Sequence, residues 1–208
     1  MSQARLFVIA APSGAGKTTL VQALTRNNAE LRFSISYTTR GQRSNEANGV
    51  DYHFVTTEQF EKLIREDALL EYAQVFDNYY GTSRAQVETH LGNGDHVILE
   101  IDWQGAQQVR KTMPDAVSVF ILPPSVEELE HRLRGRGTDS DPVIERRLRD
   151  ALSDMAHWNE FDYVIFNDDL DRAVADLEDV FSGNGERSST ATPKLRAAVK
   201  AMLAAGED

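Results

Sequence analysis

The sequence predicts an α/β fold in which a central parallel sheet is flanked by helices. Residues 6–10 (LFVIA) form a continuous apolar run rather than an alternating one, which is typical of a strand buried on both faces. Similar runs lie at 97–101, 117–122 and 163–166, and each precedes a segment with apolar residues at helical spacing. This repeated strand-to-helix alternation indicates a parallel sheet with helical crossovers.

Length, charge and cysteine content restrict the classes of protein that fit. A chain of 208 residues with 41% hydrophobic and 26% charged residues suits one compact domain. The net charge of -11 would repel a nucleic acid polymer, so an anionic partner is expected to be a small molecule. The absence of cysteine excludes disulfides, thiolate metal sites and cysteine nucleophiles. Together with the lack of a membrane-spanning run or a signal-peptide pattern, it predicts a cytoplasmic protein without membrane contact.

The first strand leads through a Gly/Pro/Ser turn into a helix predicted over 18–26, because Leu20, Val21 and Leu24 recur at helical spacing. Residues 33–83 then break the rhythm and are interpreted as an inserted subdomain of mixed β and α structure, within a core of 1–32 and 84–182. The insertion combines β-type segments at 33–36, 52–55 and 70–75 with a helix near 57–66. It could be a surface excursion without function, but long insertions on α/β sheets usually lie over the ligand crevice, which favours a substrate flap.

An arginine-rich segment at about 126–150 predicts a helical lid. Its helix begins after Ser125, is interrupted by glycines and polar residues, and resumes at Pro142. The polar stretch 182–192 is typical of a linker, and Leu195, Val199, Met202 and Leu203 then indicate an amphipathic tail helix. Residues 183–208 are therefore expected to be a linker and a helix, which leaves a homodimer or higher oligomer open.

The strongest local motif lies between the first strand and the first helix. Residues 11–18 read Ala-Pro-Ser-Gly-Ala-Gly-Lys-Thr, at the position where backbone N–H groups and a helix N-terminus can cradle phosphate. Gly14 and Gly16 allow the backbone to curl around oxygens, Lys17 can bridge terminal phosphates, and the Thr18 hydroxyl can ligate Mg²⁺. Ala11 stands where the general motif has glycine, so the loop must avoid a positive φ there. The alternative is a tight turn with a solvated lysine, but the order of elements favours nucleotide binding.

Further motifs identify a family that this chain resembles. They are residues 36–43, 48–54, 71–73, 78–82, 100–105, 122–125, 134–137 and 167–169. In this order the chain closely resembles guanylate kinases over residues 5 to 181. The resemblance implies a P-loop kinase with an inserted nucleoside-monophosphate-binding subdomain and a lid, with ATP as phosphoryl donor, GMP as acceptor and Mg²⁺ as cofactor.

The chemistry of the insertion agrees with this resemblance. Guanine presents a ring N–H beside an amino group, and one carboxylate, that of Glu71, can accept from both, while Ser36 and Thr82 supply hydroxyls. Adenine offers no such paired donors. The residues that the resemblance assigns to the GMP phosphate are Arg40, Arg43, Tyr52 and Tyr80.

The resemblance assigns the remaining site residues as follows. Glu100 and Asp102 end a buried strand, where they would support the acceptor or a metal-bound water; the alternative is an acid that caps the next helix. Arg136 and Arg147 match lid arginines that neutralise phosphate charge, and Asn167 matches the residue that holds adenine. The expected ATP-binding residues are Ser13, Gly14, Ala15, Gly16, Lys17, Thr18, Thr19 and Asn167.

The predicted reaction is Mg²⁺-dependent transfer of the ATP γ-phosphoryl group to GMP, and to dGMP, in purine nucleotide metabolism and GMP recycling. The acceptor phosphate is already ionised, so no general base is needed, and Lys17 with Arg136 and Arg147 would neutralise charge. Two alternatives remain. One is a non-catalytic guanylate-kinase-like module that binds phosphopeptides, against which the intact P-loop argues. The other is a kinase of a different nucleotide, which would lack Glu71 with Ser36 and Thr82.

Overall fold

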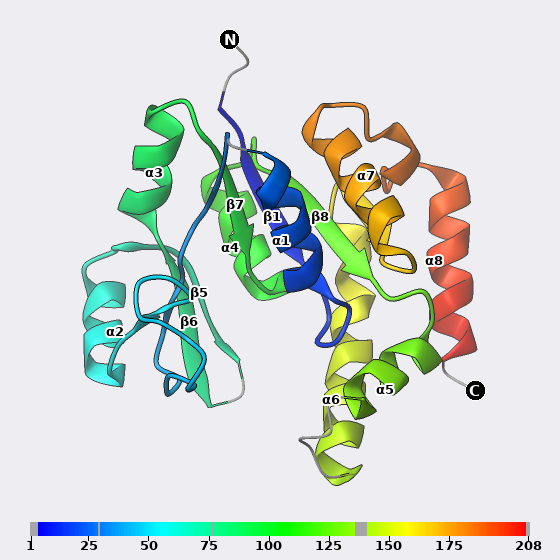
Figure 1. Ribbon diagram of the computed structural model, residues 1–208, viewed down its shortest axis with the longest axis horizontal. Coiled ribbons are helices and arrows are strands. Elements are labelled where there is room, and N and C mark those ends of the chain that lie inside the picture. Colours follow the sequence, from blue (N-terminus) through cyan, green and yellow to red (C-terminus); the bar gives the residue numbers. More distant parts are fainter. Residues whose placement is uncertain (1–3, 29, 76, 136–140, 207–208) are drawn as a thin grey trace. The chain divides into compact units, whose positions relative to one another are not determined.

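The computed structural model describes residues 4–28, 30–75, 77–135 and 141–206 (Figure 1). The chain forms two compact units. The first contains Met1–Val8 and Ala29–Val117, and the second contains Ile9–Asn28 and Ser118–Asp208.

The larger sheet confirms the predicted parallel α/β architecture. Its strands, in spatial order, are β2 (Leu31–Phe33), β7 (His96–Glu100), β1 (Leu6–Ala10), β8 (Val117–Leu122) and β9 (Tyr163–Phe166). Pairing is parallel between β2 and β7 and between β8 and β9. Every residue of β1 and β8 is buried, as the continuous apolar runs predict.

The first unit also carries the separate mixed sheet expected of the insertion. Its spatial order is β4 (His53–Phe54), β3 (Tyr37–Thr38), β6 (Asn78–Ser83) and β5 (Leu69–Val75). The β3/β4 pair is parallel, whereas β6 is antiparallel to both β3 and β5. The helices of this unit are α2 (Thr57–Arg65), α3 (Arg84–Gly92) and α4 (Trp103–Thr112). A capping box between Thr56 and Gln59 begins α2, and its buried Phe60 stacks on Tyr79 with ring centroids 5.2 Å apart.

One strand was wrongly assigned from the sequence. Residues 33–36 were expected to be a β segment of the insertion, but the structure places Leu31–Phe33 in the larger sheet, with Leu31 opposite His96 on β7. Because β2 is an edge strand, Arg32 and Phe33 are exposed, and the segment shows no continuous apolar run.

The helices of the second unit begin at the end of the phosphate loop, residues 11–18, or follow it in sequence. They are α1 (Lys17–Asn27), α5 (Val126–Arg134), α6 (Asp141–Met155), α7 (Leu170–Phe181) and α8 (Pro193–Ala205), with 3-10 turns η1 (Ala156–Glu160) and η2 (Glu186–Ser188). Ser125 and Asp169 cap α5 and α7. The predicted break in the lid falls on residues 136–140, outside the described residues.

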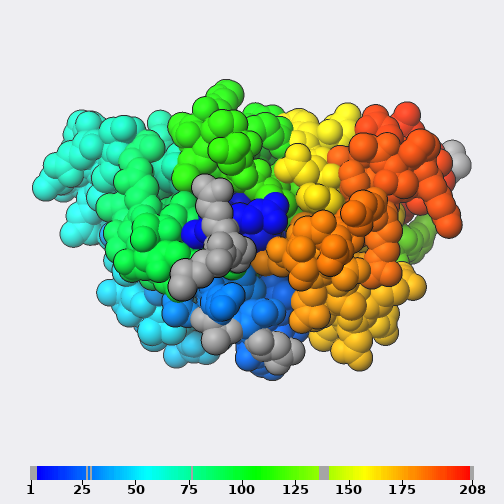
Figure 2. Space-filling view, turned by 90° about the horizontal axis from the view of Figure 1, so that it is seen from above, coloured from blue at the N-terminus to red at the C-terminus, as the bar shows by residue number. Residues whose placement is uncertain are grey.

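The stretch expected to be a linker, residues 182–192, is packed within the second unit. Ser188 in η2 is buried, Ser189 bridges to Tyr163, and the Thr190 hydroxyl donates to the Phe161 carbonyl at 2.6 Å. The hydroxyls of Thr190 and Thr192 donate to backbone carbonyls, which holds the stretch in place within the unit. Figure 2 shows α8 in red at the surface of this unit, next to the orange segment that contains η2. Its Val199 is fully buried, which agrees with the predicted amphipathic helix.

Candidate functional site

The P-loop has the backbone conformation that its glycines predict. Gly14 and Gly16 have φ angles of +96° and +89°, in the left-handed region that only glycine enters readily. Among the described residues, Asp67 is the only non-glycine with a positive φ. Ala11, which stands where the general motif has glycine, therefore has no positive φ, as the sequence predicts.

Neither glycine has room for a side chain. A Cβ on Gly16 would lie 2.4 Å from Nδ2 of Asn167, and one on Gly14 would lie 2.9 Å from Cδ1 of Leu129. Both distances are shorter than real Cβ contacts, so side-chain packing as well as φ restricts these two positions to glycine.

Helix α1 begins at the loop without a side-chain cap. Its N-cap residue, Gly16, makes no side-chain capping bond, whereas Thr56, Ser83 and Ser125 cap α2, α3 and α5. Backbone N–H groups and the positive end of the helix dipole can then serve an anion. Lys17 is half-buried at this end, and Thr18 and Thr19 are exposed in the first turn. This arrangement is the one that phosphate binding requires.

Two side chains from distant parts of the second unit hold the P-loop backbone. Asn167 is 8% exposed, and its Nδ2 donates to the Ala15 carbonyl at 2.7 Å. Arg132 donates from Nη2 to the Asn167 carbonyl at 3.0 Å and from Nη1 to the Ala15 carbonyl at 3.4 Å. Its Nε donates to Glu128 at 2.8 Å, which fixes the guanidinium. Arg132 was not predicted individually as a site residue. The sequence feature that pointed to its segment was the excess of arginines at about 126–150.

One predicted lid arginine contacts the loop directly. Nη2 of Arg147, on α6, donates to the Ser13 hydroxyl at 2.8 Å, although the two residues are 134 positions apart. Arg136, the other predicted lid arginine, lies outside the described residues. The structure therefore brings together Ser13, Ala15, Gly16, Arg147 and Asn167, all within the second unit.

In the first unit, Glu71 and Thr82 form a buried polar pair. They face each other in the β5/β6 register, with exposed fractions of 3% and 1%. The Thr82 hydroxyl donates to Oε1 of Glu71 at 2.6 Å. A carboxylate is costly to bury without hydrogen bonds, and this one lies on a two-stranded antiparallel pair that fixes its position. The pair is the arrangement expected for reading a base with two adjacent donors.

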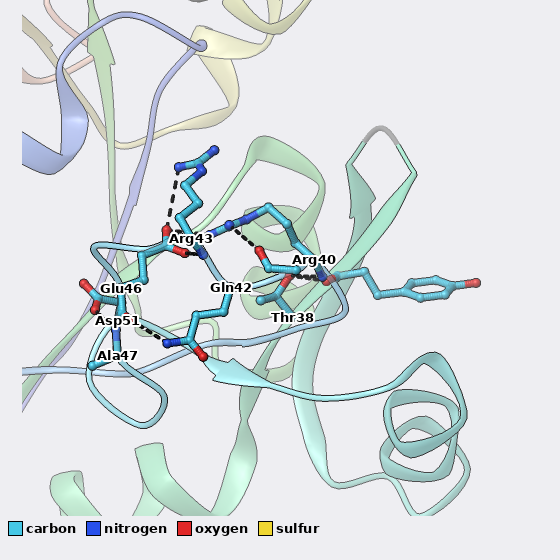
Figure 3. A network of polar contacts seen from close by, with 9 residues as sticks. Thr38, Arg40, Gln42, Arg43, Glu46, Ala47 and Asp51 are labelled. Carbon is cyan, nitrogen blue, oxygen red and sulfur yellow. Dashed lines mark hydrogen bonds and ion pairs between the residues drawn. The ribbon is translucent and has the colours of Figure 1, made fainter.

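The loop after β3 contains an ion-pair network around Glu46 (Figure 3). Nη2 of Arg40 lies 2.7 Å from Oε1 of Glu46, and the backbone N–H of Arg43 donates to Oε2 at 2.8 Å. The Arg43 guanidinium is 3.6 Å from the same carboxylate, and its side chain is 69% exposed. The hydrogen bond from Arg40 lowers the pKa of Glu46, with a further contribution from the Arg43 N–H, and the bond to Glu46 raises the pKa of Arg40.

Further hydrogen bonds hold this loop in place (Figure 3). The Thr38 hydroxyl accepts from the Arg40 N–H at 3.1 Å, and Asp51 accepts from the Ala47 N–H at 2.7 Å. Glu46 was missed by sequence reasoning. The sequence feature that could have found it is an acid three residues after Arg43, in a loop that carries two predicted phosphate-binding arginines.

The aromatic residues of the predicted phosphate site surround Arg40. Its guanidinium lies 5.4 Å from the Tyr52 ring centroid and 5.7 Å from that of Phe54. The rings of Tyr52 and Tyr80 meet edge to face with centroids 6.0 Å apart. Burial raises the pKa of Tyr52, so its hydroxyl remains protonated at neutral pH and can donate to an anion.

Three predicted acceptor residues lie at the ends of strands or helices. Ser36 is half-buried immediately before β3, and its carbonyl accepts from the His53 N–H at 2.9 Å. Glu100 is half-buried at the end of β7. Asp102 is the N-cap of α4, with Oδ1 accepting from the Gly105 N–H at 2.8 Å. Asp102 therefore caps α4, and its predicted role toward the acceptor or a metal-bound water stays a prediction.

The parallel α/β fold and the phosphate loop define a P-loop nucleotide-binding protein. The family model for guanylate kinases matches residues 3–184. The guanylate kinase of Hydrogenovibrio crunogenus is 58% identical over 179 residues, covering 86% of this chain and 87% of that protein. The guanylate kinase of Alkalilimnicola ehrlichii is 50% identical over 198 residues, covering 95% and 98%. The chain belongs to the guanylate kinase family.

Structural similarity agrees with this assignment. A crystal structure of guanylate kinase from Anaplasma phagocytophilum has a TM-score of 0.74 and 32% identity, covering 88% of this chain and 87% of that one. The chain is accordingly an enzyme, an ATP:GMP phosphotransferase, and the non-catalytic phosphopeptide-binding alternative is not favoured. Within the described part of the chain, none of the helices has both the length and the apolar content of a membrane span.

Proposed function

We propose that the two units divide the substrates of this reaction, with Mg²⁺-ATP held by the second unit and GMP by the first. The products are ADP and GDP, and dGMP is accepted in place of GMP. This activity would serve purine nucleotide metabolism and GMP recycling in the cytoplasm.

The observation that carries the acceptor assignment is the buried pair of Glu71 and Thr82, joined at 2.6 Å. A carboxylate at this position can accept from both the ring N–H and the exocyclic amino group of guanine. The hydroxyls of Thr82 and Ser36 can hydrogen-bond to the remaining polar atoms of the base. Adenine would leave the buried carboxylate without its two donors, at a cost of about 1–3 kcal/mol. Glu71 therefore selects guanine.

The GMP phosphate is assigned to Arg40, Arg43, Tyr52 and Tyr80. Arg40 is already oriented by Glu46, and Arg43 has the most exposed side chain of the network. A phosphate dianion offers these guanidiniums stronger acceptors than water does. The protonated Tyr52 hydroxyl supplies a further donor.

The ATP phosphates are assigned to the backbone of Ser13–Thr19, to Lys17 and to Arg147. The α1 N-terminus has no side-chain cap to compete with an anion, and Arg147 already reaches the loop at Ser13. Asn167, which donates to the Ala15 carbonyl beside the loop, is assigned to the adenine, as the family resemblance implies. Arg136 is proposed as the second charge-neutralising arginine.

The residues present fit a magnesium ion that is bound mainly through substrate. No cluster of three or more acidic or histidine ligands occurs among the residues that the structure describes, and Mg²⁺ with nucleotides needs only one or two protein ligands. Thr18, exposed in the first turn of α1, would be such a ligand. The ion would contribute charge neutralisation at the phosphates.

Catalysis then requires alignment and charge neutralisation rather than proton transfer. An oxygen of the GMP phosphate attacks the γ-phosphorus of ATP, the bond to the bridging oxygen breaks, and ADP leaves. The acceptor oxygen is already ionised, so no side chain needs to act as general base. Lys17 and Arg147 neutralise charge on the transferring group, and exclusion of water prevents hydrolysis of ATP.

A coupled assay of ADP release across GMP, dGMP, AMP, CMP and dTMP tests the proposal. We expect turnover with GMP and dGMP only, and we expect Glu71→Gln to lose selectivity for GMP over AMP. Equal turnover of GMP and AMP by the unmodified enzyme would overturn the assignment of Glu71. Omission of Mg²⁺ should abolish turnover with either guanine nucleotide.

A further inference from the structure

Helix α4 packs against β5 at the position of the guanine-reading carboxylate. We infer that Gly105 and Gln108, on one face of α4, are positioning residues for Glu71 and thereby determine selectivity for guanine. This inference rests on the proposed role of Glu71. It concerns how the acceptor is selected and assigns neither residue a direct contact with it.

The first observation is the close approach of Gly105 to the carboxylate. A Cβ at this position would lie 2.4 Å from Oε2 of Glu71 and 3.1 Å from its Cδ, so either the helix or the carboxylate would have to move. Gly105 is buried and lies in the first turn of α4, where Asp102 caps its N–H at 2.8 Å. The cap holds the helix start in place, and the carboxylate is therefore the group expected to shift.

The second observation is a pair of hydrogen bonds from Gln108 to the residue that follows Glu71. Oε1 of Gln108 accepts from the Tyr72 N–H at 3.1 Å, and Nε2 donates to the Tyr72 carbonyl at 2.6 Å. Among the strands that the structure describes, β5 lies at the edge of its sheet, so no strand pairs with its outward backbone groups there. The Gln108 amide satisfies both groups at Tyr72, as a strand neighbour would.

These contacts fix Glu71 from two directions. Gln108 holds the backbone beside it, and Gly105 leaves the space that its carboxylate occupies, while Thr82 bonds the opposite oxygen at 2.6 Å. Both oxygens must face adjacent donors of one base edge, and a lateral shift would preserve one hydrogen bond while losing the other. The loss is expected to show as reduced recognition of the exocyclic amino group.

The test compares GMP with IMP, whose base has the same ring N–H and carbonyl but lacks the exocyclic amino group. The measured quantity is the ratio of kcat/KM for GMP to that for IMP, in Gly105→Ala and in Gln108→Ala. We expect each variant to lower this ratio, by about tenfold for Gly105→Ala, with KM for ATP unchanged. A general loss of packing would lower kcat/KM for both nucleotides equally and leave the ratio unmoved.

Two further variants make the outcome unambiguous. Gly92→Ala adds the same methyl group to a helix of the same unit, at a position where a Cβ meets nothing within 4 Å, and should leave the ratio unchanged. Glu71→Gln should itself collapse the ratio. An unchanged ratio in Glu71→Gln would refute the proposed role of Glu71. A collapse there, with unchanged ratios in Gly105→Ala and Gln108→Ala, would refute this inference alone. If Gly105→Ala does not fold, Gln108→Ala decides, because it removes hydrogen bonds at the surface and adds no bulk.

Discussion

Glu46 lies 2.7 Å from Arg40 through Oε1 and accepts the Arg43 N–H through Oε2 at 2.8 Å. The two arginines proposed to bind the GMP phosphate are thus organised by an acid of their own loop. This acid fixes the direction of the Arg40 guanidinium while neutralising part of its charge. A side chain that is oriented before binding loses less conformational freedom when its ligand arrives.

Removal of Glu46 should weaken GMP binding, because the side chain of Arg40 and the backbone of Arg43 would lose the carboxylate that holds them in place. Glu46→Ala is expected to raise KM for GMP about tenfold, whereas Glu46→Gln, which can still accept hydrogen bonds, should raise it less. Steady-state kinetics with GMP as the varied substrate checks both, with the exposed Ser44→Ala as control. A lower KM in Glu46→Ala would show instead that Glu46 competes with phosphate.

The same carboxylate should make loop stability depend on pH. The pKa of Glu46 is lowered from 4.5, so its ion pairs stabilise the fold above that value and are lost as the pH falls through the lower folded value. When the melting temperature is measured as the pH is lowered, the unmodified protein should therefore lose stability that Glu46→Gln does not lose. Identical acid profiles of the two proteins would contradict this expectation.

Lys17 should be essential for turnover but not for GMP binding. Lys17→Ala is expected to lower kcat by at least about a hundredfold, because it removes a charge at the transferring phosphate. GMP affinity, measured by calorimetry, should be unchanged, since every residue proposed to bind GMP lies in the first unit. The exposed Lys111→Ala serves as the control, and near-normal turnover of Lys17→Ala would refute the assignment.

Gly16→Ala should impair ATP binding beyond the effect of backbone strain. The new Cβ would lie 2.4 Å from Nδ2 of Asn167 in addition to adopting a left-handed φ. Gly94→Ala is a matched control, because Gly94 has a φ of +88° and open space around its Cβ. We expect the control to lose about 1 kcal/mol of stability with normal kinetics. Gly16→Ala should raise KM for ATP, and equal kinetics of both variants would exclude the contact with Asn167 as a cause.

Arg132→Ala should loosen the P-loop without removing a predicted phosphate ligand. It removes the bonds to the carbonyls of Ala15 and Asn167. We expect kcat/KM for ATP to fall about tenfold, because the loop loses two of the hydrogen bonds that hold its backbone and only part of their contribution is passed on to ATP binding. Arg26→Ala, an exposed arginine in the last turn of α1, is the control. An unchanged KM for ATP in Arg132→Ala would show that Asn167 holds the loop alone.

Features that depend on neighbouring residues could be predicted from the sequence. The buried runs of β1 and β8 reflect burial on both sheet faces, and the P-loop follows from residue types that act within a few positions. Its glycines have the expected φ angles, and the order of motifs identified the family correctly. Family resemblance also selected Glu71 and Thr82, which prove to be bonded to each other.

Features that depend on distant contacts could not be predicted. The contact of Arg132 with Ala15 joins residues 117 positions apart, and that of Gln108 with Tyr72 joins residues 36 apart. Glutamine and arginine are both compatible with exposed helical positions, so the sequence gives no signal for these individual contacts, although the excess of arginines marks the segment around Arg132. Strand β2 was missed for a related reason, since an edge strand with exposed Arg32 and Phe33 lacks the apolar pattern of a buried one.

The packing of η2 and α8 extends beyond the end of the family match at residue 184. Val199 is completely buried there, and the Thr190 N–H donates to the Asp162 carbonyl at 2.9 Å. The end of the family match and the end of the packed second unit are therefore different residues in this protein, and the Alkalilimnicola ehrlichii relative, which covers 95% of the chain, also extends past residue 184. A version trimmed at residue 184 would expose the apolar surface that Val199 covers and should aggregate, although every residue assigned to chemistry would still be present.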